Sequence, residues 1–443
     1  MAAVTGLLTA LTMPIIGAIV DHTKYRWDVG AWTAFLLIFI NGIQICVGPS
    51  TWFFVALLQV AAGYLYTCHS VVTYAYMPEL TSNKDELAVM ASSFNMWQFF
   101  AETVYLLVVV VVSIVGSLDD ITAAKFSQTM ICLISLVLLG FSWIYLFGPR
   151  PALHEVPSGS SLVRVGFTRM RTTYNELKAD FGEIRKFLLA MAFAEAGGEQ
   201  TSQKQNKNKL SHFLTHPNPK KKLIASAFAS IAITYLVEVL GMESSETGIV
   251  FLTTLMFGVP GSLWARHLML KVGTEKAYKG ALMWWGTVTC LAPFFMNKPE
   301  QSGNAYIIGI LWGIGFGWLY PTQRTTYCLL IPGGQESELM GLYIFAGQII
   351  VWFPPLMFSI LVTNNIPMPY GLGLCCGLFF YIALVITMFI DFESGFDKAK
   401  ESVHLRQMGE DAGGSGSTGE LEAGESAAAK LGPKPDRNSS NML

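Results

Sequence analysis

The chain has 443 residues, of which 52% are hydrophobic and only 14% are charged, whereas about a quarter of the residues in a soluble domain carry charge. A soluble globular protein is therefore excluded, and the formal net charge of −2 gives no basic surface for nucleic acid. The seven cysteines lie in apolar runs without CxxC or zinc-ligand spacing, so we expect reduced core cysteines and no bound metal or cofactor.

Eleven apolar runs approach the roughly 20 residues needed to cross a bilayer, and they predict an all-α polytopic membrane protein. Five runs precede a polar connector at 148–186, and six follow it. Residues 396–443 are rich in Gly, Ser, Glu and Ala, which predicts a disordered tail. The predicted spans cover residues 4–21, 31–48, 52–76, 88–115, 127–147, 187–241 (interrupted), 248–265, 279–296, 304–331, 338–363 and 370–391.

The distribution of basic residues predicts the orientation of the chain. Fourteen Lys and Arg residues belong to connections on one side, against Lys125 and Lys298 on the other, so the positive-inside rule places the connector and the tail in the cytosol. An odd number of spans puts residue 1 on the opposite, lumenal side. We therefore expect that one span is missing before residue 1 and that the sequence is a truncated chain or a fragment.

Residues 198–224 interrupt the sixth predicted span with a polar segment that carries six lysines. These charges would cost several kcal/mol if they were held in lipid. Without the segment, residues 187–197 run into residues 225–242 as one helix of ordinary length. We interpret the insertion as a retained intron or an error of gene prediction. A genuine extramembrane insertion is the alternative, and transcript sequencing would decide between them.

A short repeat relates the two parts of the chain. Gly63–Tyr66 recurs as Gly317–Tyr320, and Pro78, which is expected to end its helix, recurs at the same offset as Pro332. Two tandem copies of one helical unit, within 1–147 and 187–395, are typical of transporters built from parallel repeats. The alternative is coincidence, because clusters of glycine and aromatic residues are common in membrane helices.

The first predicted connection carries a candidate gating loop. Gly17 allows two helices to touch, and Asp21 can accept a charge-assisted hydrogen bond from a neighbouring helix. Lys24 and Arg26 are expected to hold the loop at the cytosolic headgroups. The alternative is that these are ordinary positive-inside residues of a short loop.

Four segments resemble the autophagy-related vacuolar amino-acid effluxer family, a branch of the major facilitator superfamily; they are residues 14–21, 76–80, 187–190 and 329–343. The resemblance extends over most of residues 4–395. It implies the major facilitator fold of two six-helix halves, here without its first helix. It also implies a vacuolar or lysosome-like membrane and export of amino acids from the lumen.

Polar side chains inside the predicted spans are the candidates for function, because lipid makes them costly. Arg324 is the one Lys or Arg outside the loops, the insertion and the tail, and residues 322–326 around it are all polar. We expect Arg324 to bind a substrate carboxylate, or a gate carboxylate such as that of Asp21. The alternative is that Arg324, two turns from its helix end, extends to the cytosolic interface.

Asn95, Gln98 and Glu102 fall at i, i+3 and i+7 of the fourth span and are expected to line a cavity together. Glu102, nearest the middle of the membrane, is the first candidate for carrying a proton from an acidic lumen to the cytosol. Glu195 is the second candidate for carrying the proton. At residues 195–197 this chain reads Glu-Ala-Gly, where the resembling family tends to carry Asn-Asp-Gly. For both acids the alternative is a structural hydrogen bond between helices.

Two more side chains complete the predicted site. Gln348 lies in the span that matches the span of Gln98, and we expect the two amides to face each other across the cavity. His69 could bind substrate or respond to pH, although a packing role is the more frequent one for such a histidine.

These residues predict a secondary transporter whose two helical halves rock about a central site for a small solute, an amino acid by the resemblance. Proton-coupled transport and uncoupled efflux down a gradient are both open. No GxxxxGK[ST], GxSxG or HExxH motif occurs, which argues against an enzyme. The alternative function is a transporter-like receptor or scaffold that binds solute without turnover. The sequence carries no signal of oligomeric state.

Overall fold

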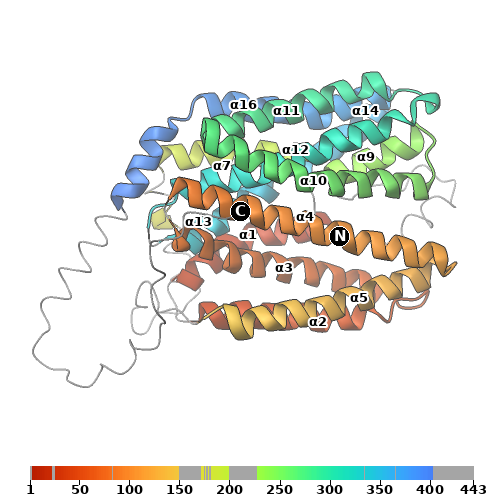
Figure 1. Cartoon of the computed structure of the whole chain (residues 1–443), viewed down its shortest axis with the longest axis horizontal. Coiled ribbons are helices and arrows are strands. Elements are labelled where there is room, and N and C mark those ends of the chain that lie inside the picture. Colours follow the sequence, from red (N-terminus) through yellow and green to blue (C-terminus); the bar gives the residue numbers. More distant parts are fainter. Residues whose placement is uncertain are drawn as a thin grey trace, which may run out of the picture.

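The helical prediction is confirmed along the described chain. The structure, a computed structural model, describes residues 2–21, 25–81, 83–148, 171–173, 175, 178, 181–198, 227–333, 335–364 and 366–402. Every regular element in these ranges is a helix (Figure 1). Within these ranges the described parts of all eleven predicted spans fall mainly on helices, and seven helical stretches are long and apolar enough to cross a membrane.

The helices of the first part of the chain occupy the side of Figure 1 that holds α2, α3 and α5. Their bounds are Ala2–Asp21 (α1), Arg26–Gln44 (α2), Trp52–Leu80 (α3), Lys84–Val115 (α4) and Asp120–Phe141 (α5), the last continued by a π-helical turn, Ser142–Leu146 (η1). Helix α3 passes through Pro78 and ends two residues later, so the prediction that Pro78 ends its helix is wrong by half a turn. A proline lacks only one backbone donor, and its helix can bend and continue within a packed bundle.

Most helices of the second part lie on the opposite side of the same view, with α11, α14 and α16 outermost, whereas α13 lies beside α1. Their bounds are Gly182–Gly198 (α7), Ala227–Glu238 (α9), Ser244–Val272 (α10), Thr274–Phe295 (α11), Pro299–Gln301 (η3), Asn304–Leu330 (α12), Glu336–Ile349 (α13), Phe353–Thr363 (α14), Met368–Leu372 (α15), Gly373–Gly377 (η4) and Leu378–Met388 (α16). Residues 392–402 form a further helix. Three predicted segments lie outside the described residues: the insertion after residue 198, most of the connector, and the tail beyond residue 402.

Helices of the two sets pack on one another: α1 and α3 pack on α13, α4 packs on α10, and α12 contacts both α3 and α4. Within the second set, α10 and α12 approach so closely that glycines form the contact. A Cβ added to Gly317 would lie 2.2 Å from the carbonyl oxygen of Gly258, and one added to Gly313 would lie 2.3 Å from that of Thr254. Small residues of this kind allow two membrane helices to pack backbone against backbone.

The predicted span at 338–363 is interrupted, since α13 ends at Ile349 and α14 begins at Phe353. Two prolines, Pro354 and Pro355, start α14 and cannot donate backbone hydrogen bonds to the preceding turn. The Trp352 indole N–H donates instead to the Ile349 carbonyl oxygen at 2.8 Å, which satisfies a backbone group that the break releases.

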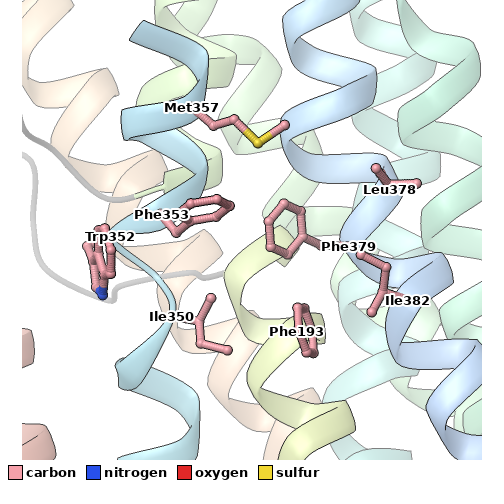
Figure 2. A pocket seen from close by; sticks show the side chains of 8 residues that line it. All are labelled: Phe193, Ile350, Trp352, Phe353, Met357, Leu378, Phe379 and Ile382. Atoms are coloured by element: carbon pink, nitrogen blue, oxygen red, sulfur yellow. The ribbon is translucent and has the colours of Figure 1, made fainter. Parts of the chain in front are cut away.

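An apolar cavity of about 400 Å³ lies next to this break (Figure 2). Its wall is made of side chains from α7, the break itself, α14 and α16, and none of its accessible surface is polar: Phe193, Ile350, Trp352, Phe353, Met357, Leu378, Phe379 and Ile382. A polar solute would lose its hydrogen bonds to water there without replacement. The candidate polar site is therefore found elsewhere in the bundle.

Candidate functional site

Arg324 is buried at the junction of the two sets of helices. Its side chain extends from α12, is 6% exposed, and places the guanidinium carbon 4.3 Å from the ring centre of Tyr74 on α3 and 4.9 Å from that of Phe94 on α4. The atoms Nε and Nη1 have no hydrogen-bond acceptor among the described residues. Arg324 therefore does not extend to an interface; it is a buried cation held by two aromatic faces, with donors to spare.

The neighbouring residue Gln323 joins three helices. Its Nε2 donates to Glu195 Oε1 on α7 at 2.6 Å and contacts the Tyr343 hydroxyl oxygen on α13 at 3.2 Å. Its Oε1 is buried without a donor among the described residues. Consecutive helical residues point about 100° apart. Gln323 therefore faces α7 and α13 while Arg324 faces α3 and α4, and Arg324 is still near enough to Glu195 for their charges to attract.

Two aromatic rings beside this cluster are partly accessible. Phe94 is 43% exposed although its ring covers the Arg324 guanidinium. Tyr66 is 44% exposed although it lies within electrostatic range of Tyr74, Glu102 and Arg324.

Gln98 and Glu102 form a pair on α4, in which Gln98 Nε2 donates to Glu102 Oε1 at 3.1 Å. Asn95 does not join them. It is 2% exposed and donates to the hydroxyl of Ser262 on α10 at 3.0 Å, so the prediction that all three side chains line one cavity is wrong for Asn95. The reason is a neighbouring helix: α10 packs on α4 at residues 95 and 99, where Ser262 and Gly258 face them.

The two remaining predicted site residues have neighbours of their own. His69 Nδ1 is 3.4 Å from the hydroxyl of Thr33, and the imidazole packs edge-on against Trp143, so it lies among the first five helices. Gln348 is partly buried in the last turn of α13, where its Oε1 lies 3.2 Å from the position that a Cβ on Gly6 of α1 would occupy.

The far end of α1 is bound to the start of α13. Asp21 is 2% exposed, and its carboxylate accepts hydrogen bonds from the backbone N–H groups of Ser337 at 3.2 Å and Glu338 at 2.7 Å. These donors belong to the first turn of α13, where helical N–H groups lack partners and the helix dipole favours an anion. Gly17 lies so near that a Cβ there would be 2.3 Å from the Ser337 carbonyl oxygen.

Arg26 lies in the first turn of α2 and is 4% exposed, so the prediction that it lies at the headgroups is wrong. It forms an ion pair with Glu79 at the end of α3, and its guanidinium carbon lies 4.4 Å from the ring centre of Tyr76. A buried carboxylate and an aromatic face outweigh the attraction of lipid phosphates. Lys24 lies outside the described residues.

Several residues of the cluster were not predicted as site residues. Gln323 was noted only as a polar neighbour of Arg324, and Tyr74, Phe94 and Tyr343 were not considered. The aromatic residues carry no local signal that separates them from ordinary packing residues. Among the described residues no three His, Cys, Asp or Glu side chains come together in a way that could hold a metal ion.

Two sets of long apolar helices, a buried cation and two acids at their junction, and a hydrogen-bonded closure at one end define a membrane transporter rather than an enzyme. The chain belongs to the Major Facilitator Superfamily, whose sequence profile matches residues 1–351.

Solved structures of known transporters share the fold. The human organic anion transporter MFSD10 is 12% identical, with 87% of this chain and 82% of that chain covered and a TM-score of 0.60. The proton:xylose symporter XylE is 12% identical, with 87% and 84% covered and a TM-score of 0.59. The transporter FucP, in its outward conformation, is 14% identical, with 86% of each chain covered and a TM-score of 0.55.

One curated relative is similar in sequence. Autophagy-related protein 22 of Kluyveromyces lactis is 21% identical over 179 residues, which make up 39% of this chain and 36% of that protein. The match thus spans about a third of the relative's own length.

Proposed function

We propose that this protein exports amino acids, or small solutes like them, from a vacuole or lysosome-like lumen by alternating access. The proposal rests on the buried guanidinium of Arg324, whose Nε and Nη1 lack acceptors among the described residues. An uncompensated buried cation costs several kcal/mol, and a carboxylate-bearing solute would relieve that cost. The resemblance of residues 329–343 to amino-acid effluxers and the similarity to Autophagy-related protein 22 support the choice of substrate and membrane.

In this proposal the solute carboxylate binds Arg324 from the side on which Tyr66 and Phe94 are exposed. Gln98 lies on the same side of the bundle as Glu102, and both are partly exposed. Gln98 would contact the solute there and Glu102 would carry the proton if transport is coupled, with Glu195 as the second candidate. Gln348 would contact the solute from α13, where the neighbouring Gly347 borders the Glu195 side chain.

The Asp21 closure supplies the gate of the proposed cycle. The excess of Lys and Arg in the connections on that side favours the cytosolic face, so the bonds from Asp21 to α13 would close the cytosolic entrance. Export then requires these bonds to break after the solute has bound from the lumen. The tail would lie in the cytosol on the same reasoning.

The test is flux of a labelled amino-acid mixture in vesicles that carry the full chain, with and without an imposed pH gradient. Arg324→Ala is expected to lower flux at least tenfold, because a charge-assisted hydrogen bond contributes roughly 1.5–3 kcal/mol. Arg266→Ala is the matched control, since Arg266 is an exposed arginine on α10. Unchanged flux in Arg324→Ala would contradict the proposed site.

Two further results distinguish proton-coupled transport, uncoupled efflux and binding without transport. Glu102→Gln should abolish the effect of the pH gradient if Glu102 carries the proton, and should change nothing if efflux is uncoupled. Solute binding without flux in a correctly inserted wild-type chain would contradict transport and favour a receptor or scaffold.

A further inference from the structure

Arg324 and Glu195 present opposite charges to one region without neutralising each other. The ion pairs among the described residues join other partners, and Arg324 is held by Tyr74 and Phe94 rather than by a carboxylate. Glu195 receives one hydrogen bond, from Gln323, on Oε1. Its second oxygen, Oε2, has no donor within the described part of the chain.

The helices keep these two charges apart. Glu195 is on α7, and the Gln323 amide that binds it is also held by the Tyr343 hydroxyl. Arg324 is the next residue of α12, but it points toward α3 and α4, where two rings fix its guanidinium. Arg324 is therefore a fixed cation and Glu195 a fixed anion, and each has unused hydrogen-bonding capacity. The two side chains lie against different faces of α12.

We infer that this pair recognises both ends of an α-amino acid: Arg324 binds the carboxylate, and Glu195 Oε2 accepts from the ammonium group. This inference rests on the proposed function and adds to it which residue binds each end of the solute. A zwitterion is the solute that satisfies both residues at once. An organic anion would leave Glu195 without its donor, and an amine would leave Arg324 without its acceptor; each leaves a buried charge uncompensated.

Gln323 has a positioning role in this arrangement. Its Nε2 orients the Glu195 carboxylate through Oε1 and so leaves Oε2 for the ligand. Its own Oε1 is buried and has no donor among the residues described.

The experiment measures binding and flux with three forms of one amino acid in vesicles carrying the full chain. The forms are free leucine, N-acetyl-leucine, which lacks the ammonium charge, and leucinamide, which lacks the carboxylate. Wild type should bind either blocked form at least tenfold more weakly than leucine, because each loses a charge-assisted hydrogen bond. Glu195→Gln keeps an acceptor for Gln323 and should bind leucine and N-acetyl-leucine within about threefold of each other.

The controls distinguish this inference from the proposed function. Glu300→Gln changes an exposed acid in the short helix η3 and should keep the wild-type ratios. If Glu195→Gln still rejects N-acetyl-leucine tenfold, or if wild type binds it as well as leucine, the zwitterion inference is overturned while transport can stand. Binding with the predicted ratios but without flux overturns transport and leaves the inference intact. If no form binds to wild type, both are overturned for this substrate class.

Discussion

Substitution of Gly17 by alanine should open the Asp21 closure. The added Cβ would lie 2.3 Å from the Ser337 carbonyl oxygen, which is about 0.7 Å inside the 3.0 Å that real Cβ contacts respect. Backbone lies on both sides of the contact, so no side chain can rotate away, and α1 must move from α13 by a similar distance. That shift lengthens the bond from Ser337 N–H to Asp21 past hydrogen-bonding range and weakens the bond from Glu338 N–H.

Loss of one charge-assisted hydrogen bond costs about 2 kcal/mol, which raises the open-to-closed ratio about thirtyfold. The assay is alkylation of a cysteine placed at position 337, where serine is fully buried, followed by peptide mass spectrometry. The labelling rate should rise about thirtyfold in Gly17→Ala and similarly in Gly341→Ala, whose Cβ would lie 2.5 Å from the Met13 carbonyl oxygen.

Gly248→Ala is the matched control, because no atom lies within 4 Å of the position of its Cβ. It should leave the labelling rate at position 337 unchanged. Equal rates in wild type and Gly17→Ala would refute the reasoning, since they would mean that the close contact does not hold the Asp21 closure.

Three other predictions concern the fixed parts of the bundle. Gly317→Ala should destabilise the protein by about 1–3 kcal/mol in thermal unfolding, because its Cβ would meet the Gly258 carbonyl oxygen at 2.2 Å; an unchanged Tm would contradict that packing. Asn95→Ala should cost about 1 kcal/mol through loss of its bond to Ser262 but leave solute affinity within about twofold, whereas a large affinity loss would return Asn95 to the binding site. Asp119 caps α5, and hydrogen bonds from Thr122 and from backbone N–H groups lower the pKa of its carboxyl group. The stabilisation that these bonds give to the folded protein is complete above the ordinary pKa of 3.8 and is lost as pH falls through the lowered value. Wild type, but not Asp119→Asn, should therefore lose stability in that pH range.

The helices were predictable because the bilayer imposes one simple requirement. A backbone in lipid must satisfy its own hydrogen bonds, so an apolar run of sufficient length becomes a helix. The described parts of the eleven runs are mainly helical, with a break at 350–352. The break at 350–352 could also have been predicted, since Pro354 and Pro355 follow it. The run is apolar on both sides of the break, however, and hydropathy alone indicates a single span.

The cluster was only partly predictable, because its bonds join distant parts of the chain. The cost of a cation in lipid singled out Arg324, and the same reasoning singled out Glu195. The residue that links Glu195 to α12, Gln323, is 128 positions away, and nothing local shows that it points toward α7. Arg26 was misplaced for the same reason, since its partner Glu79 is 53 positions further along the chain.

The backbone contact between α1 and α13 also affects how fast the Asp21 closure can open and close. Contacts made by long side chains must recover particular rotamers each time they re-form, and each such chain loses up to about 2 kcal/mol of conformational entropy. At Gly17 and Gly341 there are no rotamers to recover, and the surfaces that meet are rigid carbonyls and Cα atoms. Once the two hydrogen bonds of Asp21 have broken, this seam can part and close again without any search among side-chain conformations.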